Sequence, residues 1–148
     1  MFGSYEYPQQ GDIGELSAME WLAYKGAHVA VPVGHSPHWD VLAELDGRLV
    51  RVQVKTSKCF VKNRWDITLC TRGGNQSWNG LSKVLDTTRF DYLFVLVGDG
   101  RRWFIPSRAL GGVSGLRLGG PKYAEFEVEP GRPIDDFRAS GAPLESAA

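Results

Sequence analysis

The 148-residue chain has the apolar fraction (43%) and charged fraction (23%) of an ordinary soluble globular protein, and a domain of this length needs no disulfides for stability. No apolar run approaches the roughly 20 residues of a membrane span, and the first residues lack the basic and apolar regions of a secretion signal, so we expect a cytoplasmic protein with no membrane partner. We expect one domain over residues 1–129 and a flexible tail over residues 130–148, which are rich in Pro, Gly, Ala and Ser.

Opposite charges cancel over the whole chain but are unevenly distributed along it. Residues 1–47 hold one Lys and seven acidic residues, residues 48–117 hold 13 Lys and Arg and four acidic residues, and residues 118–148 hold three basic and six acidic residues. The three blocks therefore have net charges of −6, +9 and −3. A basic middle block can attract phosphate groups, although an unevenly charged solvated surface would give the same pattern.

The first predicted element is a helix over residues 12–25. Asp12 is a suitable N-cap, four apolar residues recur at helical spacing, and Gly26 follows the last turn. A nearly continuous apolar run then predicts a strand over residues 28–33.

A hairpin is predicted next, because Asp46-Gly47 separates two alternating runs at residues 39–45 and 48–56. If these two residues form the turn, opposite positions sum to 93, and Asp40 lies across from Gln53. The register is self-consistent, because one face then carries only apolar side chains from the two strands. These are Val41, Ala43, Leu45, Val50 and Val52.

Alternating helical and strand patterns continue to residue 128. They predict a strand at 65–71, a loop at 73–80, a helix at 81–85, strands at 92–97 and 103–105, and a strand or helix at 123–128. This order predicts an α/β fold with a central sheet covered by helices.

The polar face of the hairpin carries the residues with chemical potential. Asp40 and Gln53 face each other, and Lys55 follows Gln53 two residues later on the same face. Oxygen ligands on a rigid scaffold suit Mg²⁺, and an adjacent lysine can activate a water or stabilise charge on a phosphate. The set therefore indicates phosphodiester hydrolysis, although alternation from Val50 to Lys55 is also typical of any half-exposed strand.

Three motifs together resemble the PD-(D/E)XK nuclease superfamily, in particular its intron-encoded homing endonucleases and archaeal Holliday-junction resolvases. They are Gly11-Asp-Ile-Gly-Glu-Leu16, Pro32-Val-Gly34 leading to Asp40, and Val52-Gln-Val-Lys-Thr-Ser57. The resemblance covers residues 9–106 and implies a restriction-endonuclease-like mixed central sheet flanked by helices.

The resemblance also implies a role for each site residue. Asp40 would be the central metal ligand, Gln53 a second ligand, Lys55 the catalytic lysine, and Glu15 the helix carboxylate that reaches the metal. The backbone carbonyl of Val54 would be a further ligand, and the metal would be Mg²⁺, with Mn²⁺ as a substitute.

The sequence departs from the family pattern at two positions. Pro37 lies three residues before Asp40, so there is no Pro-Asp pair, and Gln53 stands where most members carry Asp or Glu. The intron-encoded branch itself uses Gln-x-Lys. Glu15 also has a structural alternative, because Asp12 and Glu15 have the spacing of a capping box.

Basic side chains beyond the site strand are candidate contacts to DNA phosphates, with a solvated loop as the alternative. The resemblance adds Ser57, which would contact phosphate or support Lys55. The predicted nucleic-acid contacts are Ser57, Lys58, Lys62, Arg64 and Arg72. Cys59 and Cys70 are expected to be buried free thiols.

The main hypothesis is a metal-dependent endonuclease that acts on double-stranded or branched DNA. A homodimer or homotetramer is expected, because a single site per chain needs a second, symmetry-related site to cut both strands. The alternatives are a non-catalytic DNA-binding module of the same fold and a protein-interaction domain.

Overall fold

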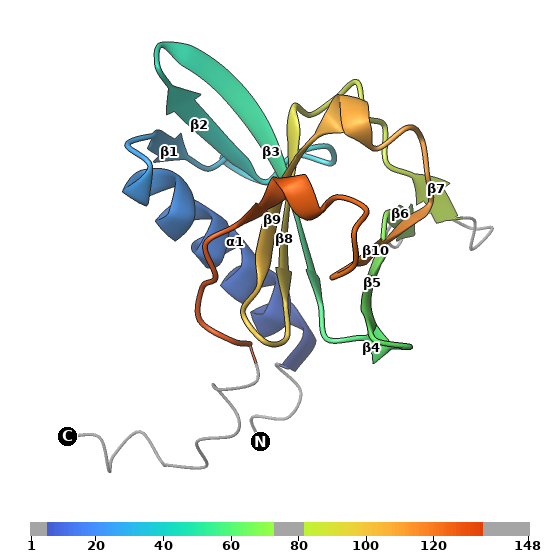
Figure 1. Ribbon diagram of the computed structural model, residues 1–148. Helices are drawn as coiled ribbons and strands as arrows, with labels where there is room; N and C mark the ends of the chain where they lie inside the picture. Colours follow the sequence, from blue (N-terminus) through green and yellow to red (C-terminus); the bar gives the residue numbers. More distant parts are fainter. Residues whose placement is uncertain (1–5, 73–81, 135–148) are drawn as a thin grey trace.

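A computed structural model describes the backbone of residues 6–72 and 82–134 and the side chains of residues 10–70 and 84–134. Its centre is a six-stranded sheet with the strand order β1-β2-β3-β8-β9-β11 (Figure 1). The strands are β1 (His28–Ala30), β2 (Val41–Leu45), β3 (Arg48–Ser57), β8 (Tyr92–Val97), β9 (Arg102–Pro106) and β11 (Glu127–Val128). Strands β3 and β8 are parallel and all other neighbours antiparallel, so the sheet is mixed, as expected.

The predicted hairpin register is confirmed. Leu45 pairs with Arg48 and Val41 with Val52, so paired positions sum to 93. Val41, Ala43, Val50 and Val52 are buried in one core, with Leu45 packed at its edge. Strand β1 ends at Ala30, three residues earlier than predicted, and Pro32, which follows, has no N–H to donate to a sheet.

Helix α1 (Glu6–Tyr24) covers one face of the sheet. Its buried residues Ala18 and Leu22 belong to the same core as β2 and β3. Gly14 brings the helix very close to β3, because a Cβ added there would lie 2.2 Å from Cγ2 of Thr56. The helix begins six residues before the predicted start, so Asp12 lies inside it and is not its N-cap.

A second, smaller sheet covers the other face, where no additional sheet was predicted. Its order is β10-β5-β4, formed by β10 (Gly115–Leu118), β5 (Arg64–Thr68) and β4 (Phe60–Val61). Together with β8 and β9 it encloses a second core around Leu93, Val95 and Trp103.

Two predicted elements on this side differ from the structure. The strand expected at 65–71 is divided into β5 and β6 (Cys70–Arg72), and the helix expected at 81–85 is wrong, because β7 (Ser82–Val84) pairs with β6. Of the described residues, only α1 forms an α-helix, so the sheet is flanked by one helix and not by several. The loop expected at 73–80 lies outside the described residues.

The chain after β11 forms a strap, residues 129–134, that packs back onto the domain. Ile134 is 3% exposed in the core beneath α1, and its N–H donates to the carbonyl of Gly98 at 3.1 Å. Gly131 and Pro133 are half-buried, whereas Pro130 and Arg132 are exposed. Within the described ranges, no helix has the length and apolar character to cross a membrane.

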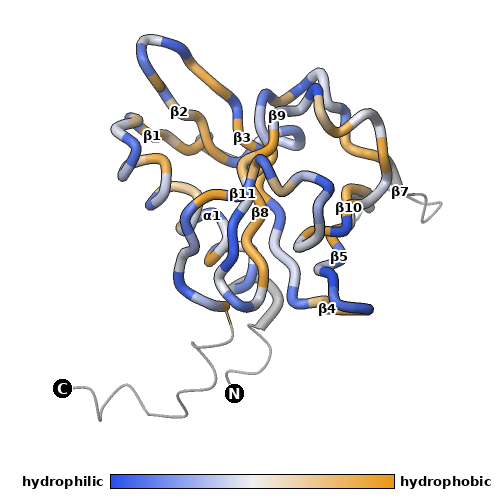
Figure 2. The backbone as a smooth tube through the Cα atoms, viewed as in Figure 1, coloured by the Kyte–Doolittle hydropathy of each residue, from blue (hydrophilic) through white to orange (hydrophobic). Residues whose placement is uncertain are grey.

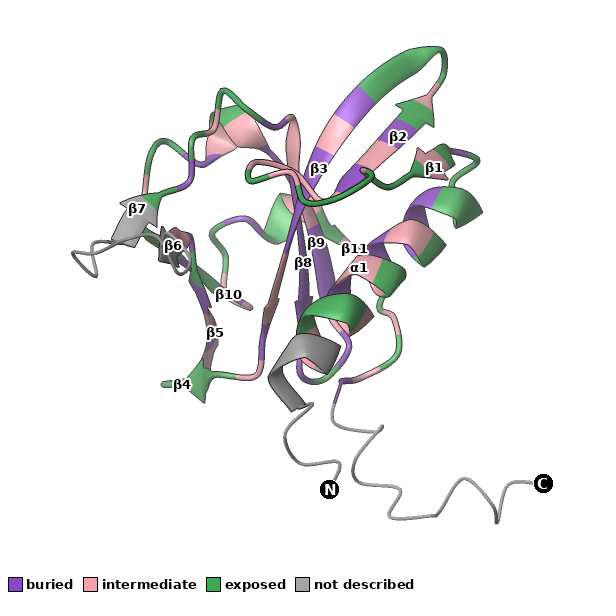
Figure 3. Ribbon diagram, turned by 180° about the vertical axis from the view of Figure 1, so that it is seen from behind, coloured by how far each residue is buried: buried purple, intermediate pink, exposed green. Residues whose placement is uncertain are grey.

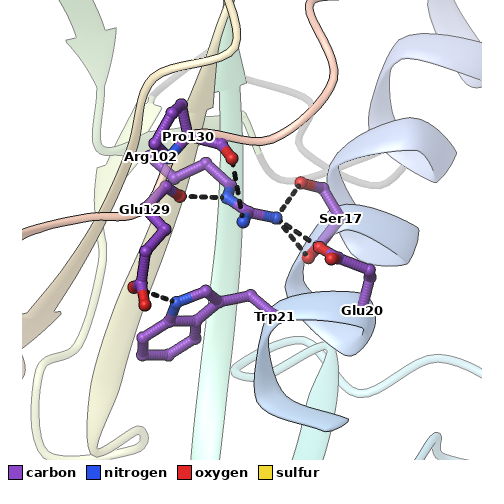
Figure 4. Close-up of polar contacts among 6 residues, drawn as sticks. All are labelled: Ser17, Glu20, Trp21, Arg102, Glu129 and Pro130. Atoms are coloured by element: carbon purple, nitrogen blue, oxygen red, sulfur yellow. Dashed lines mark hydrogen bonds and ion pairs between the residues drawn. The ribbon is translucent and has the colours of Figure 1, made fainter. Parts of the chain in front are cut away.

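One buried arginine ties the strap to the helix (Figure 4). Arg102 is 3% exposed, and its guanidinium donates to the carbonyls of Glu129 (2.8 Å) and Pro130 (3.3 Å). On α1 it donates to the carbonyl and hydroxyl of Ser17, both at 3.3 Å, and to the carboxylate of Glu20. A single side chain thus fixes α1, β9 and the strap relative to one another.

Candidate active site

Asp40 lies immediately before β2, where the hairpin ladder ends. Its backbone N–H still donates to the Val52 carbonyl at 2.8 Å. Its carboxylate oxygen Oδ2 accepts hydrogen bonds from Gln53 Nε2 at 2.9 Å and from the Val54 N–H at 2.8 Å. The structure therefore brings the Asp40 and Gln53 side chains together, as the register predicted.

Gln53 is buried in the middle of β3, with 8% of its surface exposed. Its Nε2 also lies 3.5 Å from the Val54 carbonyl oxygen, a second weak acceptor. A buried amide is stable only when it is hydrogen-bonded, and Asp40 supplies the main partner.

Glu15 reaches the same place from α1. Burial raises the pKa of its carboxyl, and the nearby Asp40 and Asp12 charges raise it further. The two carboxyl groups are close enough for the charge of Asp40 to raise the pKa of Glu15. The capping-box alternative for Glu15 is wrong, because the helix starts at Glu6 and Asp12 caps nothing.

The pKa of Asp40 is also raised, principally by burial. The Val54 N–H and the positive charge of Lys55 oppose that shift. Two adjacent carboxyl groups that both resist ionisation are better ionised when a cation lies between them. Glu15 and Asp40 therefore suit a divalent metal ion.

Lys55 is half-buried on the same side of β3 as Gln53. Burial lowers the pKa of its amine, while the negative charge of Asp40 opposes this shift. Its ammonium is therefore electrostatically coupled to Asp40.

Two hollows open on either side of Asp40 and β3. One, of about 270 Å³, is lined by Glu15 and Asp40 together with Asp12 and His35. The other, of about 480 Å³, lies between the end of β3 and strand β5, and Lys55, Lys58 and Cys59 are among its lining residues. The carboxylates of Glu15 and Asp40 thus line one hollow and Lys55 the other.

The predicted DNA contacts fall into different environments. Lys62 is exposed, whereas Lys58 and Arg64 are half-buried. Ser57 is buried, and its hydroxyl donates to the Asp66 carbonyl and accepts from the Cys59 N–H, so both of its hydrogen bonds lie within the protein. Arg72 belongs to β6, but its side chain lies outside the described part of the chain.

Several features of the site were not predicted. Asp12 and His35 line the first hollow, and the one-turn spacing of Asp12 and Glu15 was the only sequence signal for the former. Cys59 and Cys70 are free, as expected, but Cys59 is exposed and Cys70 half-buried, so the prediction of buried thiols is wrong.

The number of acidic ligands at the site is small. Among the described residues, no three His, Cys, Asp or Glu side chains gather closely enough to hold a metal ion. A metal would therefore depend on Glu15 and Asp40 for charge, and on neutral oxygens such as those of Gln53 and Val54 for the rest.

The sheet, the helix against it and this acidic pair beside a lysine define a nuclease-like class of protein. Residues 5–114 match the model of the PD-(D/E)XK endonuclease family, and the chain belongs to this family. No curated protein sequence matches the chain significantly.

Two solved structures are similar to this fold. The bacterial homing endonuclease I-Ssp6803I has a TM-score of 0.71 and 20% sequence identity, over 82% of this chain and 88% of that chain. Hjc, a Holliday junction resolvase from the archaeon Archaeoglobus fulgidus, has a TM-score of 0.49 and 13% identity, over 90% of this chain and 98% of that chain. The first likeness establishes a restriction-endonuclease-like α/β fold.

Proposed function

We propose that this protein is a metal-dependent endonuclease that hydrolyses phosphodiester bonds in DNA. The observation that carries the proposal is the position of Asp40, which accepts a hydrogen bond from Gln53 and is coupled by charge to both Glu15 and Lys55. Membership of the endonuclease family gives the reaction class, and the basic middle block suits a phosphate backbone as substrate.

Mg²⁺, with Mn²⁺ as a substitute, fits the donor set. Glu15 and Asp40 would supply the charged ligands, and the Gln53 amide oxygen and the Val54 carbonyl the neutral ones. Because the amide nitrogen of Gln53 now faces Asp40, the amide would turn over to present its oxygen. A bound ion would polarise the phosphate and lower the pKa of a nearby water.

Lys55 would act on the substrate itself. Its ammonium would orient the attacking water or stabilise the charge that develops on the phosphate oxygens. Partial burial strengthens this interaction, because a charge is screened less away from bulk water.

One site per chain cuts one strand. Breaking both strands of a duplex would therefore take two copies related by symmetry, and we propose a homodimer or homotetramer. A double-stranded substrate and a branched one both fit this requirement.

A second function is favoured by one observation. Among the described residues, no three His, Cys, Asp or Glu side chains form a group that could hold a metal ion, and Gln53 is neutral, which suits a DNA-binding module that has lost catalysis. Such a module would bind DNA in a salt-sensitive way without needing metal.

Cleavage of plasmid and branched DNA, measured with Mg²⁺, Mn²⁺ or EDTA, separates the two functions. The nuclease requires metal-dependent cutting that Asp40→Ala abolishes and Glu44→Ala, an exposed carboxylate on the same hairpin, leaves intact. Binding without cutting under any condition would replace the nuclease by the binding module.

A further inference from the structure

A short hairpin lies beside the proposed site and has no role in the chemistry. Strands β4 and β5 are joined by Lys62 and Asn63, whose φ angles are 50° and 63°. Positive φ at both central residues is the geometry of a type I′ turn, which matches the twist of the flanking strands. The hairpin forms the outer edge of the small sheet, away from α1 (Figure 1).

The hairpin is held firmly in place. From β10, the Arg117 guanidinium bonds Asp66 Oδ1 of β5 at 3.1 Å and the Val61 carbonyl of β4 at 3.0 Å. The buried Ser57 hydroxyl, at the end of β3, donates to the Asp66 carbonyl at 2.5 Å. The hairpin is therefore fixed relative to Ser57, which lies two residues after Lys55 on β3.

Its surface combines an apolar stem with a polar tip (Figure 2). Phe60 and Val61 are 52% and 43% exposed, and Lys62 and Asn63 are exposed at the turn (Figure 3). Lysine is depleted at protein–protein interfaces, so this tip fits another protein poorly. The major groove of DNA is about 12 Å wide, admits a two-stranded ribbon, and offers both hydrogen-bonding groups and thymine methyl groups.

We propose that the β4–β5 hairpin enters the major groove of DNA and reads base edges beside the cut phosphate. This inference rests on the proposed function and makes the hairpin its specificity element. Lys62 would donate to guanine N7 and O6, Asn63 would pair with adenine N6 and N7, and the stem would contact thymine methyl groups. Lys62, which the sequence predicted to contact a phosphate, would then contact a base.

The spacing along β3 agrees with this arrangement. Val61 is the sixth residue after Lys55. Because an extended chain rises about 3.3 Å per residue, the two residues are at most about 20 Å apart. That span is about six base-pair steps at 3.4 Å each. A hairpin held within this distance of Lys55 would contact bases no more than about six base pairs from the cut phosphate.

The test removes the tip side chains without disturbing the turn. In Lys62→Gly and Asn63→Gly, the new glycine adopts positive φ freely, so the turn keeps its backbone geometry. Asp46→Gly is the matched control, since Asp46 and Gly47 form the other hairpin turn with φ values of 50° and 77°. Wild type and each variant are used, in EDTA, to select bound sequences from a pool of duplexes with a randomised centre. Each protein is then assayed for Mg²⁺-dependent cleavage of the sequences that wild type enriched.

We expect wild type and Asp46→Gly to enrich the same sequences. Each tip variant should lose preference at one or two positions and bind the wild-type winner about 5- to 150-fold more weakly. A uniform weakening across all sequences, with a shallower salt dependence, would make the tip a phosphate contact and overturn the inference. Unchanged DNA selection with an altered oligomeric state would make the hairpin an interface between copies and would also overturn it.

The two proposals fail separately. Cleavage by wild type with tip variants of unchanged selectivity would leave the nuclease standing and remove the hairpin's role. Selective binding that the tip variants lose, with no cleavage by wild type, would support the hairpin and remove the nuclease.

Discussion

The side-chain amide of Gln53 donates a hydrogen bond to the Asp40 carboxylate, with Nε2 2.9 Å from Oδ2. A neutral donor at this position stabilises the half-buried Asp40 carboxylate, whereas a third carboxylate would repel it. The glutamine is therefore compatible with a stable protein that holds no metal ion.

Gln53→Glu should make folding depend on metal. In EDTA, the new buried carboxylate loses the hydrogen bond and repels Asp40, so we expect a loss of about 2 kcal/mol in the free energy of unfolding. Added Mg²⁺ should raise the melting temperature of this variant more than that of wild type, because it binds only the folded state. Gln53→Met is the control without charge. Equal responses to Mg²⁺ in all three proteins would contradict a metal site here.

Lys55→Met should separate chemistry from metal binding. Without the Lys55 ammonium, the negative charge that develops on the phosphate is less stabilised. The cleavage rate should therefore fall about 100- to 1,000-fold. The melting temperature should still respond to Mg²⁺, because Lys55 is not a ligand. Lys122→Met, a lysine that lies over the Tyr123 ring, should cleave normally. A Lys55→Met protein that cuts at the wild-type rate would remove the catalytic assignment.

Gly14→Ala should push α1 away from β3. The new methyl group would lie 2.2 Å from Thr56 Cγ2 and 3.2 Å from Val54 Cγ1, so we expect a loss of about 1–3 kcal/mol in urea unfolding, together with weaker cleavage as Glu15 moves. Adding Thr56→Ser removes the clashing methyl and should restore part of both. Gly11→Ala, with nothing within 4 Å, should instead stabilise by up to about 1 kcal/mol. Equal effects at both glycines would exclude the close contact as the cause.

Asp91→Asn should weaken the protein in a pH-dependent way. The Arg51 guanidinium and backbone N–H bond its carboxylate, and the guanidinium is the main reason that the pKa of Asp91 lies below its ordinary value of 3.8. A depressed pKa adds stability above that ordinary value, and this stability is lost as pH falls through the lower folded pKa. The ion pair is more than one-third exposed, so we expect only about 1 kcal/mol at neutral pH. The difference from wild type should shrink below about pH 4 in urea unfolding, and a constant difference across pH would argue against the ion pair.

Arg102→Met should destabilise the whole domain. It leaves the Glu129 and Pro130 carbonyls without their buried donor, so we expect a loss of about 2–4 kcal/mol in urea unfolding. Arg108→Met, at an exposed arginine, should change stability by less than about 0.5 kcal/mol. Similar losses in the two variants would show that the buried network contributes little.

Local signals predicted the half of the site that lies on one hairpin. The Asp46-Gly47 turn fixes the register, and the register brings Asp40 to Gln53. Strand β8 was likewise predicted with its observed bounds, because six consecutive apolar residues suit a strand buried on both faces.

Contacts between distant segments were not predictable in the same way. Nothing local to residues 82–84 indicates that they pair with β6, so propensity suggested a helix there. Glu15 reaches Asp40 only because Gly14 lets α1 lie against β3, which a sequence pattern does not reveal. The buried position of Arg102 also runs against the usual exposure of arginine.

The network around Arg102 affects the order in which parts of the fold can form during synthesis. Helix α1 leaves the ribosome first, but its fixed position needs Arg102 from β9 and the strap that ends at Ile134. Glu15 therefore reaches its final place beside Asp40 only when nearly all of the described chain has been synthesised. A nascent chain would bring Glu15 to Asp40 last, after the hairpin with Asp40 and Lys55 had already formed.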